Sequence, residues 1–226
     1  MKLGILTGLA REVSCLSENQ QNVLIACSGA DPWRAETEAR ALVDGGCGAL
    51  LSFGIAGALS PDLRVGDIVV SSGVVNGNKA TYSSAENWRL RVLDALPKAQ
   101  ERTREGLIYG ADTAISSPAG KSQLYAHTGA LCVDMESHRL AMVAAETSIP
   151  FLAIRVISDD ARRALPSSAL GVIGKDGRPV ITRVLRGLVR HPGQLPSLIA
   201  LSRDMETALS QLRRVSGLIG PRFRFA

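Results

Sequence analysis

ALLSFGIAGALSPDLRVGDIVVSSGVV, residues Ala49–Val75, is the stretch that decides the fold. It opens with the apolar run Ala49–Phe53 and closes with a second apolar run, Asp67–Val75. Continuous apolar runs of this length are typical of strands that are covered on both faces. Between them lies Gly54-Ile55-Ala56-Gly57, which we predict to be a tight turn after the first strand, because glycines permit sharp turns and close backbone approach.

Outward from this stretch, apolar runs alternate with helical patterns. Five further strands are predicted at Leu3–Leu9, Asn22–Cys27, Gly106–Gly110, Ala130–Asp134 and Phe151–Ile157. Helices are predicted from Asp31 to about Asp44, from near Ser84, from near Pro118 and over Glu136–Thr147. The alternation favours an α/β fold in three layers, with helices on both faces of a central, mixed, mostly parallel twisted sheet.

The composition fits one domain that covers all 226 residues, 1–226. Hydrophobic residues make up 46% and aromatic residues only 4%, so the core must consist mainly of aliphatic side chains. No apolar run is long enough for a transmembrane helix. The four cysteines have no metal-ligand spacing, so we expect no metal site and a reducing, cytoplasmic setting.

The C-terminal segment 178–226 is basic, with nine arginines against two acids in a chain whose net charge is +5. An apolar stripe runs along one side of its first predicted helix, and three arginines lie on the other side. A second helix is expected at about Leu195–Arg214. Packing of the stripe on the sheet is the preferred interpretation, and a membrane-binding helix is the alternative. The arginines are either simply solvated or meet an anionic partner; nucleic acid is disfavoured, because no aromatic residues are interleaved.

Acidic residues lie beside glycines or at strand ends in three places. Glu12 follows the first strand, Glu136 opens a helix after a strand, and Asp159 ends the last strand. The carboxyl ends of neighbouring parallel strands meet at one edge of a sheet, so these carboxylates can share a pocket. Each also has an ordinary interpretation: Glu12 as a solvated pair with Arg11, Glu136 as a helix-dipole partner, and Asp159 as a helix cap or a member of an ion pair.

Four motifs occur in the order of a known family: MKLGILTGLAREV, GIAGALSPDLRVGDIVVS, VDMES and IRVISD. Over residues 1–160 the chain resembles the nucleoside phosphorylase and nucleosidase superfamily, and within it the methylthioadenosine/S-adenosylhomocysteine nucleosidases. VDMESHRLA, ALPSSAL and RHPGQLPSLIALSRD extend the resemblance over nearly the whole chain to the hopanoid-associated members. Those members remove adenine from adenosylhopane, leaving ribosylhopane.

The resemblance implies a role for each carboxylate in breaking a purine–ribose bond. Asp159 matches the general acid that serves the purine N7, with Ser158 in support. Glu136 matches the residue that grips the ribose hydroxyls, with Met135 against the sugar. Glu12 matches the residue that activates the attacking water. The other residues expected to line the substrate site are Gly54, Ile55, Ala56, Gly57, Ala114, Ile115 and Val133.

Two residues depart from the family pattern. Ile55 stands where a Ser or Thr is usual, and Ala114 stands near the position of an aromatic ring that stacks on the purine. Phosphorylases carry an arginine in the stretch that here reads Leu50–Phe53, although Arg11 could reach a phosphate. Water is therefore favoured over phosphate as the nucleophile, and no cofactor is expected other than phosphate in a phosphorylase.

The partner expected from this resemblance is a small or lipid-linked purine nucleoside, and the chain is expected to form a homo-oligomer. For a lipid-linked substrate, the segment 161–177 would form a lid, with Arg162 and Arg163 near headgroups and the basic C-terminal segment in peripheral contact with the inner membrane surface. Its candidate lipid contacts are Leu165, Leu170, Val172 and Ile173. The alternatives are a methylthioadenosine/S-adenosylhomocysteine nucleosidase, a phosphorylase, or a non-catalytic binding module.

Overall fold

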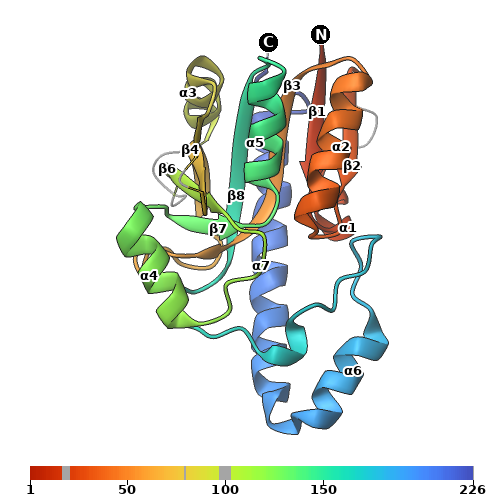
Figure 1. The fold of residues 1–226 in the computed structure, drawn as a ribbon, viewed down its shortest axis with the longest axis vertical. Helices are drawn as coiled ribbons and strands as arrows, with labels where there is room; N and C mark the ends of the chain where they lie inside the picture. Colours follow the sequence, from red (N-terminus) through yellow and green to blue (C-terminus); the bar gives the residue numbers. More distant parts are fainter. Residues whose placement is uncertain (17–20, 79, 97–102, 226) are drawn as a thin grey trace.

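Eight strands pair into one mixed sheet in the computed structural model, which describes residues 1–16, 21–78, 80–96 and 103–225 (Figure 1). The strands are β1 Lys2–Thr7, β2 Val23–Cys27, β3 Cys47–Ala58, β4 Ile68–Asn76, β5 Thr81–Ser83, β6 Thr103–Gly110, β7 Cys132–Asp134 and β8 Phe151–Asp159. The helices are α1 Ala10–Val13, α2 Pro32–Asp44, α3 Glu86–Ala95, α4 Pro118–Thr128, α5 Ser137–Glu146, α6 Ile181–Arg190 and α7 Leu195–Ile219. Two short 3₁₀ turns, η1 Ser167–Ala169 and η2 Pro192–Gln194, flank α6.

The expected α/β fold is confirmed, and each of the seven predicted strands has a counterpart. The short strand β5 was not predicted. Local signals account for the helix ends: the Asp31 carboxylate accepts hydrogen bonds from the backbone N–H groups of Trp33 and Arg34 at 2.9 and 3.1 Å, and caps α2. At α4, the Ser117 hydroxyl accepts from the N–H of Gly120 at 3.1 Å.

The sheet is curled so strongly that part of it closes on itself. β3 pairs with β8, β8 with β4, β4 with β6, β6 with β7, and β7 returns to β3. Outside the closed part, β1 pairs with the N-terminal part of β3, and β2 pairs with β1 at the edge of the sheet. β5 lies beside β4. Most pairs are parallel; β3–β7, β4–β5 and β4–β8 are antiparallel. The strand β3 therefore belongs to both parts of the sheet.

The glycine motif 54–57 lies inside β3, so the prediction of a turn was wrong. β3 pairs with β1 as far as Ser52 and with β7 from Gly57, while β8 pairs along the opposite edge throughout. The register against β8 shifts between Ala56 and Gly57, which is the signature of a bulge that bends the strand. A bent strand, rather than a turn, thus carries the chain from β1 towards β7.

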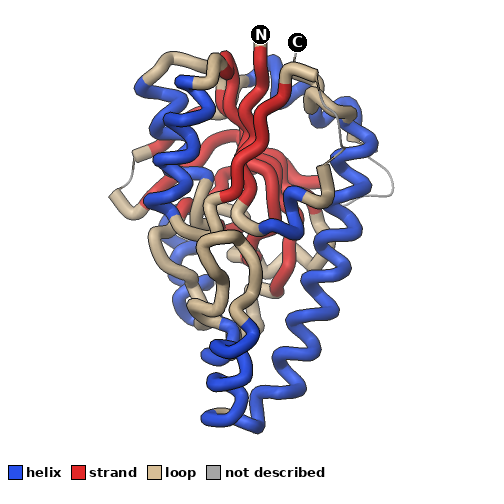
Figure 2. Tube along the Cα trace, turned by 90° about the vertical axis from the view of Figure 1, so that its right-hand side faces the viewer, coloured by secondary structure: helices blue, strands red, loops and turns tan. Residues whose placement is uncertain are grey.

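Two layers of helices cover the sheet, as Figures 1 and 2 show. The alternation of side chains along each strand sends Leu51 and Phe53 to one face and Leu50 to the other. On the first face they pack with α3 and the C-terminal half of α7, and on the second with α2 and α5. The three-layer arrangement follows from this division of one strand's residues between two cores.

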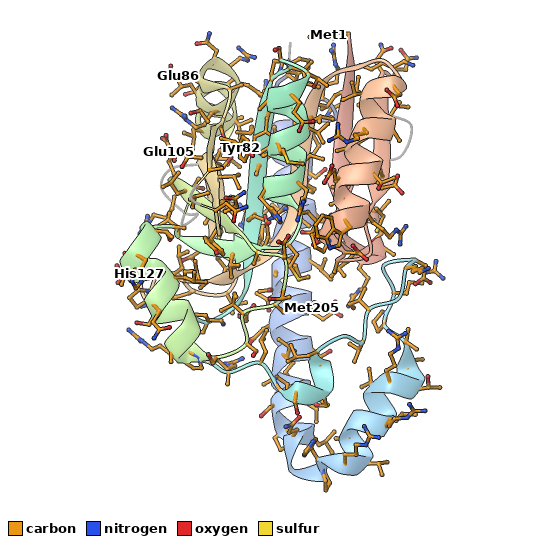
Figure 3. All side chains as sticks on the ribbon, in the orientation of Figure 1. Met1, Tyr82, Glu86, Glu105, His127 and Met205 are labelled. Carbon is orange, nitrogen blue, oxygen red and sulfur yellow. The ribbon has the colours of Figure 1, made fainter. Side chains whose placement is uncertain are left out.

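The basic C-terminal segment is only partly packed on the sheet. From Ala208 onward α7 contributes buried residues, and Met205, labelled in Figure 3, is partly buried at the start of that half. α6 has no buried residue, and its Ile181, Leu185 and Val189 are 70%, 55% and 81% exposed. The preferred interpretation that this apolar stripe packs on the sheet was wrong, because α6 lies against η1 instead, with Gly187 facing Ser168. In the described part of the chain, no helix has both the length and the apolarity needed to span a bilayer.

Candidate functional site

One pocket collects the predicted site residues from five separate parts of the chain. It opens where β3 leaves β1 and turns towards β7, at the carboxyl ends of β1, β3 and β8. Such a change of strand partner leaves a crevice in an α/β sheet, where ligands typically bind. The predicted residues that line it are Glu12, Ile55, Ala56, Gly57, Ala114, Ile115, Val133, Met135, Glu136, Ser158 and Asp159. Gly8, Leu9, Ala30, Thr113, Asp134 and Leu165 complete its wall.

Glu12 is fixed by three backbone donors. Its Oε2 accepts from the N–H groups of Gly8 and Leu9 at 2.7 and 2.8 Å, and its Oε1 accepts from the N–H of Ile55 at 2.7 Å. Burial raises the pKa of Glu12 above its ordinary value, while these hydrogen bonds and the charge of Arg155 oppose the rise. The result is an oriented carboxylate with increased basicity, as a base that takes a proton from water requires.

Glu136 lies next to a buried charge network. Arg155 donates to Asp134 Oδ2 at 2.6 Å and to Ser52 Oγ at 2.6 Å, and its Nη2 lies 3.7 Å from Glu136 Oε2. Burial, and then the negative charge of Asp134, raise the pKa of Glu136 to about 8. Glu136 therefore carries its proton at neutral pH and can both donate to and accept from a sugar hydroxyl.

Asp159 ends β8 and is held by two neighbours. Ser158 Oγ donates to its Oδ1 at 3.2 Å, and the ammonium of Lys121 donates to its Oδ2 at 2.5 Å. Ser158 Oγ also lies 3.2 Å from the carbonyl oxygen of Ala56, which ties the acid to the bent part of β3. Asp159 thus presents a fixed carboxyl group to the pocket.

Glycines make room for the carboxylates. A Cβ atom at Gly54 would lie 2.6 Å from Glu12 Oε1, and one at Gly8 would lie 2.7 Å from Glu136 Oε1. At Gly57 the corresponding contacts with both Asp159 carboxyl oxygens would be 3.1 Å. Although Gly54 does not line the pocket itself, its missing side chain is the condition for the position of Glu12.

The remaining wall is largely apolar and is crossed by segment 161–177. The N–H of Leu165 donates to Ser116 O at 2.9 Å on one side of the pocket, and the carbonyl of Gly177 accepts from Ala10 N at 3.1 Å on the other. Of the proposed lipid contacts, Leu165 lines the pocket, Val172 is buried, and Leu170 is exposed. The segment therefore runs past the pocket as a strap from Ser116, at the start of α4, to Ala10 of α1, and Leu165 is its residue in the pocket lining.

Arg11, the candidate phosphate ligand, lies outside this pocket. Its guanidinium pairs with Glu206 of α7 at 2.7 Å, and its side chain is 44% exposed. Among the described residues that line the pocket there is no arginine, lysine or histidine. The described pocket wall therefore offers carboxyl groups and the hydroxyls of Ser158 and Thr113 but no cation for a phosphate dianion.

Sequence reasoning assigned no role to Arg155, Asp134 or Lys121. A signal for the first was present, because Arg155 interrupts the apolar run Phe151–Ile157, and a charged residue inside a buried strand requires a buried partner. Lys121 had no comparable signal, since one lysine in a helix is ordinarily solvated.

The family model described as "Phosphorylase superfamily" matches residues 7–190, which include the pocket-lining residues from Gly8 to Leu165. The chain belongs to the phosphorylase superfamily. This confirms the resemblance at the level of the superfamily. The likeness to its hopanoid-associated members stays a prediction.

Relatives within the superfamily cover the whole fold. The chain is 26% identical over 232 residues to the 5′-methylthioadenosine/S-adenosylhomocysteine nucleosidase of Tolumonas auensis, covering 83% of this chain and all of that protein. The Neisseria meningitidis nucleosidase of the same name, in complex with methylthio-immucillin-A, superposes with a TM-score of 0.74 at 16% identity, covering 97% of this chain and 98% of that one. Futalosine hydrolase of Helicobacter pylori gives 0.68 at 16% identity, covering 96% and 97%.

Proposed function

We propose that this superfamily member hydrolyses the N-glycosidic bond of a 5′-substituted adenosine, with 5′-methylthioadenosine or S-adenosylhomocysteine as the substrate class. The observation that carries the proposal is the convergence of Glu12, Glu136 and Asp159, far apart in sequence, on one pocket. The names of the relatives with this fold support the same chemistry.

The three carboxyl groups suit the charges that develop as the bond breaks. The ribose becomes cationic and the departing adenine anionic, so the base needs a proton and the anomeric carbon needs a nucleophile. In the proposal Asp159 protonates N7, Glu12 takes the proton of the attacking water, and Glu136 fixes the ribose hydroxyls. A well-placed acid or base typically accelerates such a step by about 10²–10⁴-fold.

The polar groups of the pocket favour water over phosphate. A phosphate dianion needs several donors, usually including an arginine. The described residues of the pocket lining include no arginine, and Arg11 is engaged by Glu206. Glu12 Oε1 accepts only one backbone hydrogen bond, so it is instead available to orient a water molecule.

The decisive experiment is product analysis with 5′-methylthioadenosine and S-adenosylhomocysteine, with and without inorganic phosphate. We expect adenine and free 5-methylthioribose from the first substrate at a rate that phosphate does not change. Asp159→Asn should lower kcat by at least about 100-fold while adenine still binds. A pentose 1-phosphate as product would replace hydrolysis with phosphorolysis, and no adenine release from any 5′-substituted adenosine would overturn the proposal.

A lipid-linked substrate, adenosylhopane, is the second candidate. It is favoured by the apolar residues Leu9, Ile115 and Leu165 around the pocket and by the exposed apolar stripe of α6 next to the strap. Residues 178–203 contain five arginines and no acid, so an anionic bilayer complements this region in charge. The strap would then bring the pocket mouth close to the membrane surface.

Two measurements separate this candidate from the first. Adenosylhopane in mixed micelles should be turned over with a higher kcat/KM than 5′-methylthioadenosine. Sedimentation with phosphatidylglycerol vesicles should be lost in Leu185→Glu, whose side chain is 55% exposed on α6, and kept in Leu90→Glu, which is 50% exposed on α3. Equal sedimentation of both variants, or turnover of the small nucleoside alone, would remove the lipid-linked substrate.

A further inference from the structure

Lys121 is a buried residue beside the site whose burial the proposed roles leave unexplained. It lies in the first turn of α4 and is fully buried, with 0% of its side chain exposed. A buried ammonium group is costly unless it is paired and hydrogen-bonded. Here all three of its protons have acceptors: Asp159 Oδ2 at 2.5 Å, the carbonyl of Asp160 at 2.9 Å and the carbonyl of Arg163 at 3.3 Å.

These contacts place a positive charge directly behind the proposed general acid. Lys121 binds Oδ2 of Asp159, so the proposal assigns the contact with the base to Oδ1, which accepts a hydrogen bond from Ser158 and no bond from Lys121. A charge-assisted bond in a water-poor site is stronger than a neutral one, and it fixes the orientation of the carboxyl group. The ammonium therefore fixes the direction of Asp159 and lies beside the carboxyl group that the proposal assigns as the acid.

We propose that Lys121 is a positioning residue for adenine departure, which stabilises the carboxylate that Asp159 becomes when its proton moves to N7. Asp159 first takes up a proton from solvent water as the nucleoside binds; the C1′–N9 bond then breaks with its electron pair going to the purine, that proton passes from Asp159 to N7, and Lys121 keeps its three protons throughout. The ion pair seen without substrate is the arrangement of Asp159 after this transfer. The inference rests on the proposed general-acid role of Asp159 and adds the group that makes the acid effective.

A leaving group that needs no proton distinguishes this role from a merely structural one. We compare 5′-methylthioadenosine with the riboside of 4-nitrophenol, which departs as a stable phenolate. Lys121→Met should lower kcat for 5′-methylthioadenosine by about 10- to 100-fold with a small change in KM, and leave turnover of the nitrophenyl riboside within about twofold. Lys121→Arg, which keeps the charge, should recover part of the loss.

A double variant keeps the test valid if Lys121→Met folds poorly. In Asp159→Asn the acid is absent, so adding Lys121→Met should cause no further loss of adenine release, and removing both charges avoids an unpaired buried ion. Equal losses on both substrates, or additive losses in the double variant, would overturn the inference. Absence of adenine release from the wild-type protein would instead contradict the proposed function itself.

Discussion

At the scale of single residues, three carboxyl groups in one pocket have three different environments. Backbone N–H groups hold Glu12, burial and then the charge of Asp134 keep Glu136 protonated, and an ammonium pairs with Asp159. The environment decides whether the ionised or the protonated form of a carboxyl group is stable. The same functional group can therefore serve as base, as ribose ligand and as acid in the proposed reaction. The division of roles is thus a property of their neighbours.

The pKa of Glu136 leads to a prediction about stability and pH. The folded protein holds this proton up to about pH 8, whereas the unfolded chain releases it near the ordinary value of 4.5. Raising the pH between these values therefore favours unfolding, by about 1.4 kcal/mol per unit from this group. Glu136→Gln has no proton to release, so its stability relative to wild type should increase from pH 5 to pH 8.

Urea unfolding of both proteins at several pH values measures this difference. The free energy of unfolding of the variant minus that of the wild type should rise steadily from pH 5 to pH 8. Curves that stay parallel over this range would show that Glu136 ionises normally in the folded state.

Gly54 gives a second prediction at the residue scale. In Gly54→Ala the new Cβ would meet the Glu12 carboxylate at 2.6 Å, so Glu12 must leave its three backbone donors. We expect kcat/KM for the nucleoside to fall by about 100-fold, which is the typical contribution of one oriented base. Gly217→Ala is the control, because its Cβ would meet nothing within 4 Å. If both variants keep full activity, Glu12 does not need its present position.

At the scale of elements, the sequence predicted what local patterns determine. The cap at Asp31 and the apolar periodicity located α2 and the strands to within a few residues. The bend of β3 at 54–57 could not be predicted in this way, because only its partners β1, β7 and β8 distinguish it from a turn. Glycines are compatible with a bent strand and with a turn, and the contacts with the neighbouring strands decide which of the two forms.

Local sequence patterns do not encode contacts between distant segments, which explains which site residues were predicted and which were missed. Glu12, Glu136 and Asp159 were predicted from motifs at strand ends, and they do share a pocket. The Lys121–Asp159 pair joins residues 38 positions apart, on a helix and a strand whose contact no local pattern encodes. The apolar stripe of α6 was visible in the sequence, but its amphipathic pattern cannot tell burial against the sheet from exposure.

At the scale of the whole molecule, one part of the C-terminal segment contributes to the stability of the fold and another part is exposed and available for surface contact. The second half of α7 packs Leu212, fully buried, against the strands, whereas α6 and the first half of α7 extend away from the sheet (Figure 1). Substitutions in a core helix lower the free energy of unfolding, while substitutions in an exposed arm change it little. The homo-oligomer expected from the resemblance stays a prediction, and this arm is one surface that it could use.

This division gives a prediction for two leucines in the same segment. Leu212→Ala should lower the free energy of unfolding by about 2–5 kcal/mol, because it leaves a cavity between α7 and the sheet. Leu185→Ala removes a side chain that is 55% exposed, so its effect should stay within about 0.5 kcal/mol in dilute protein. Denaturant titration at low and high protein concentration measures both. A large loss for Leu185→Ala that appears only at high concentration would mean that a second copy of the chain covers α6, and a large loss at every concentration would mean that the arm folds back onto its own sheet.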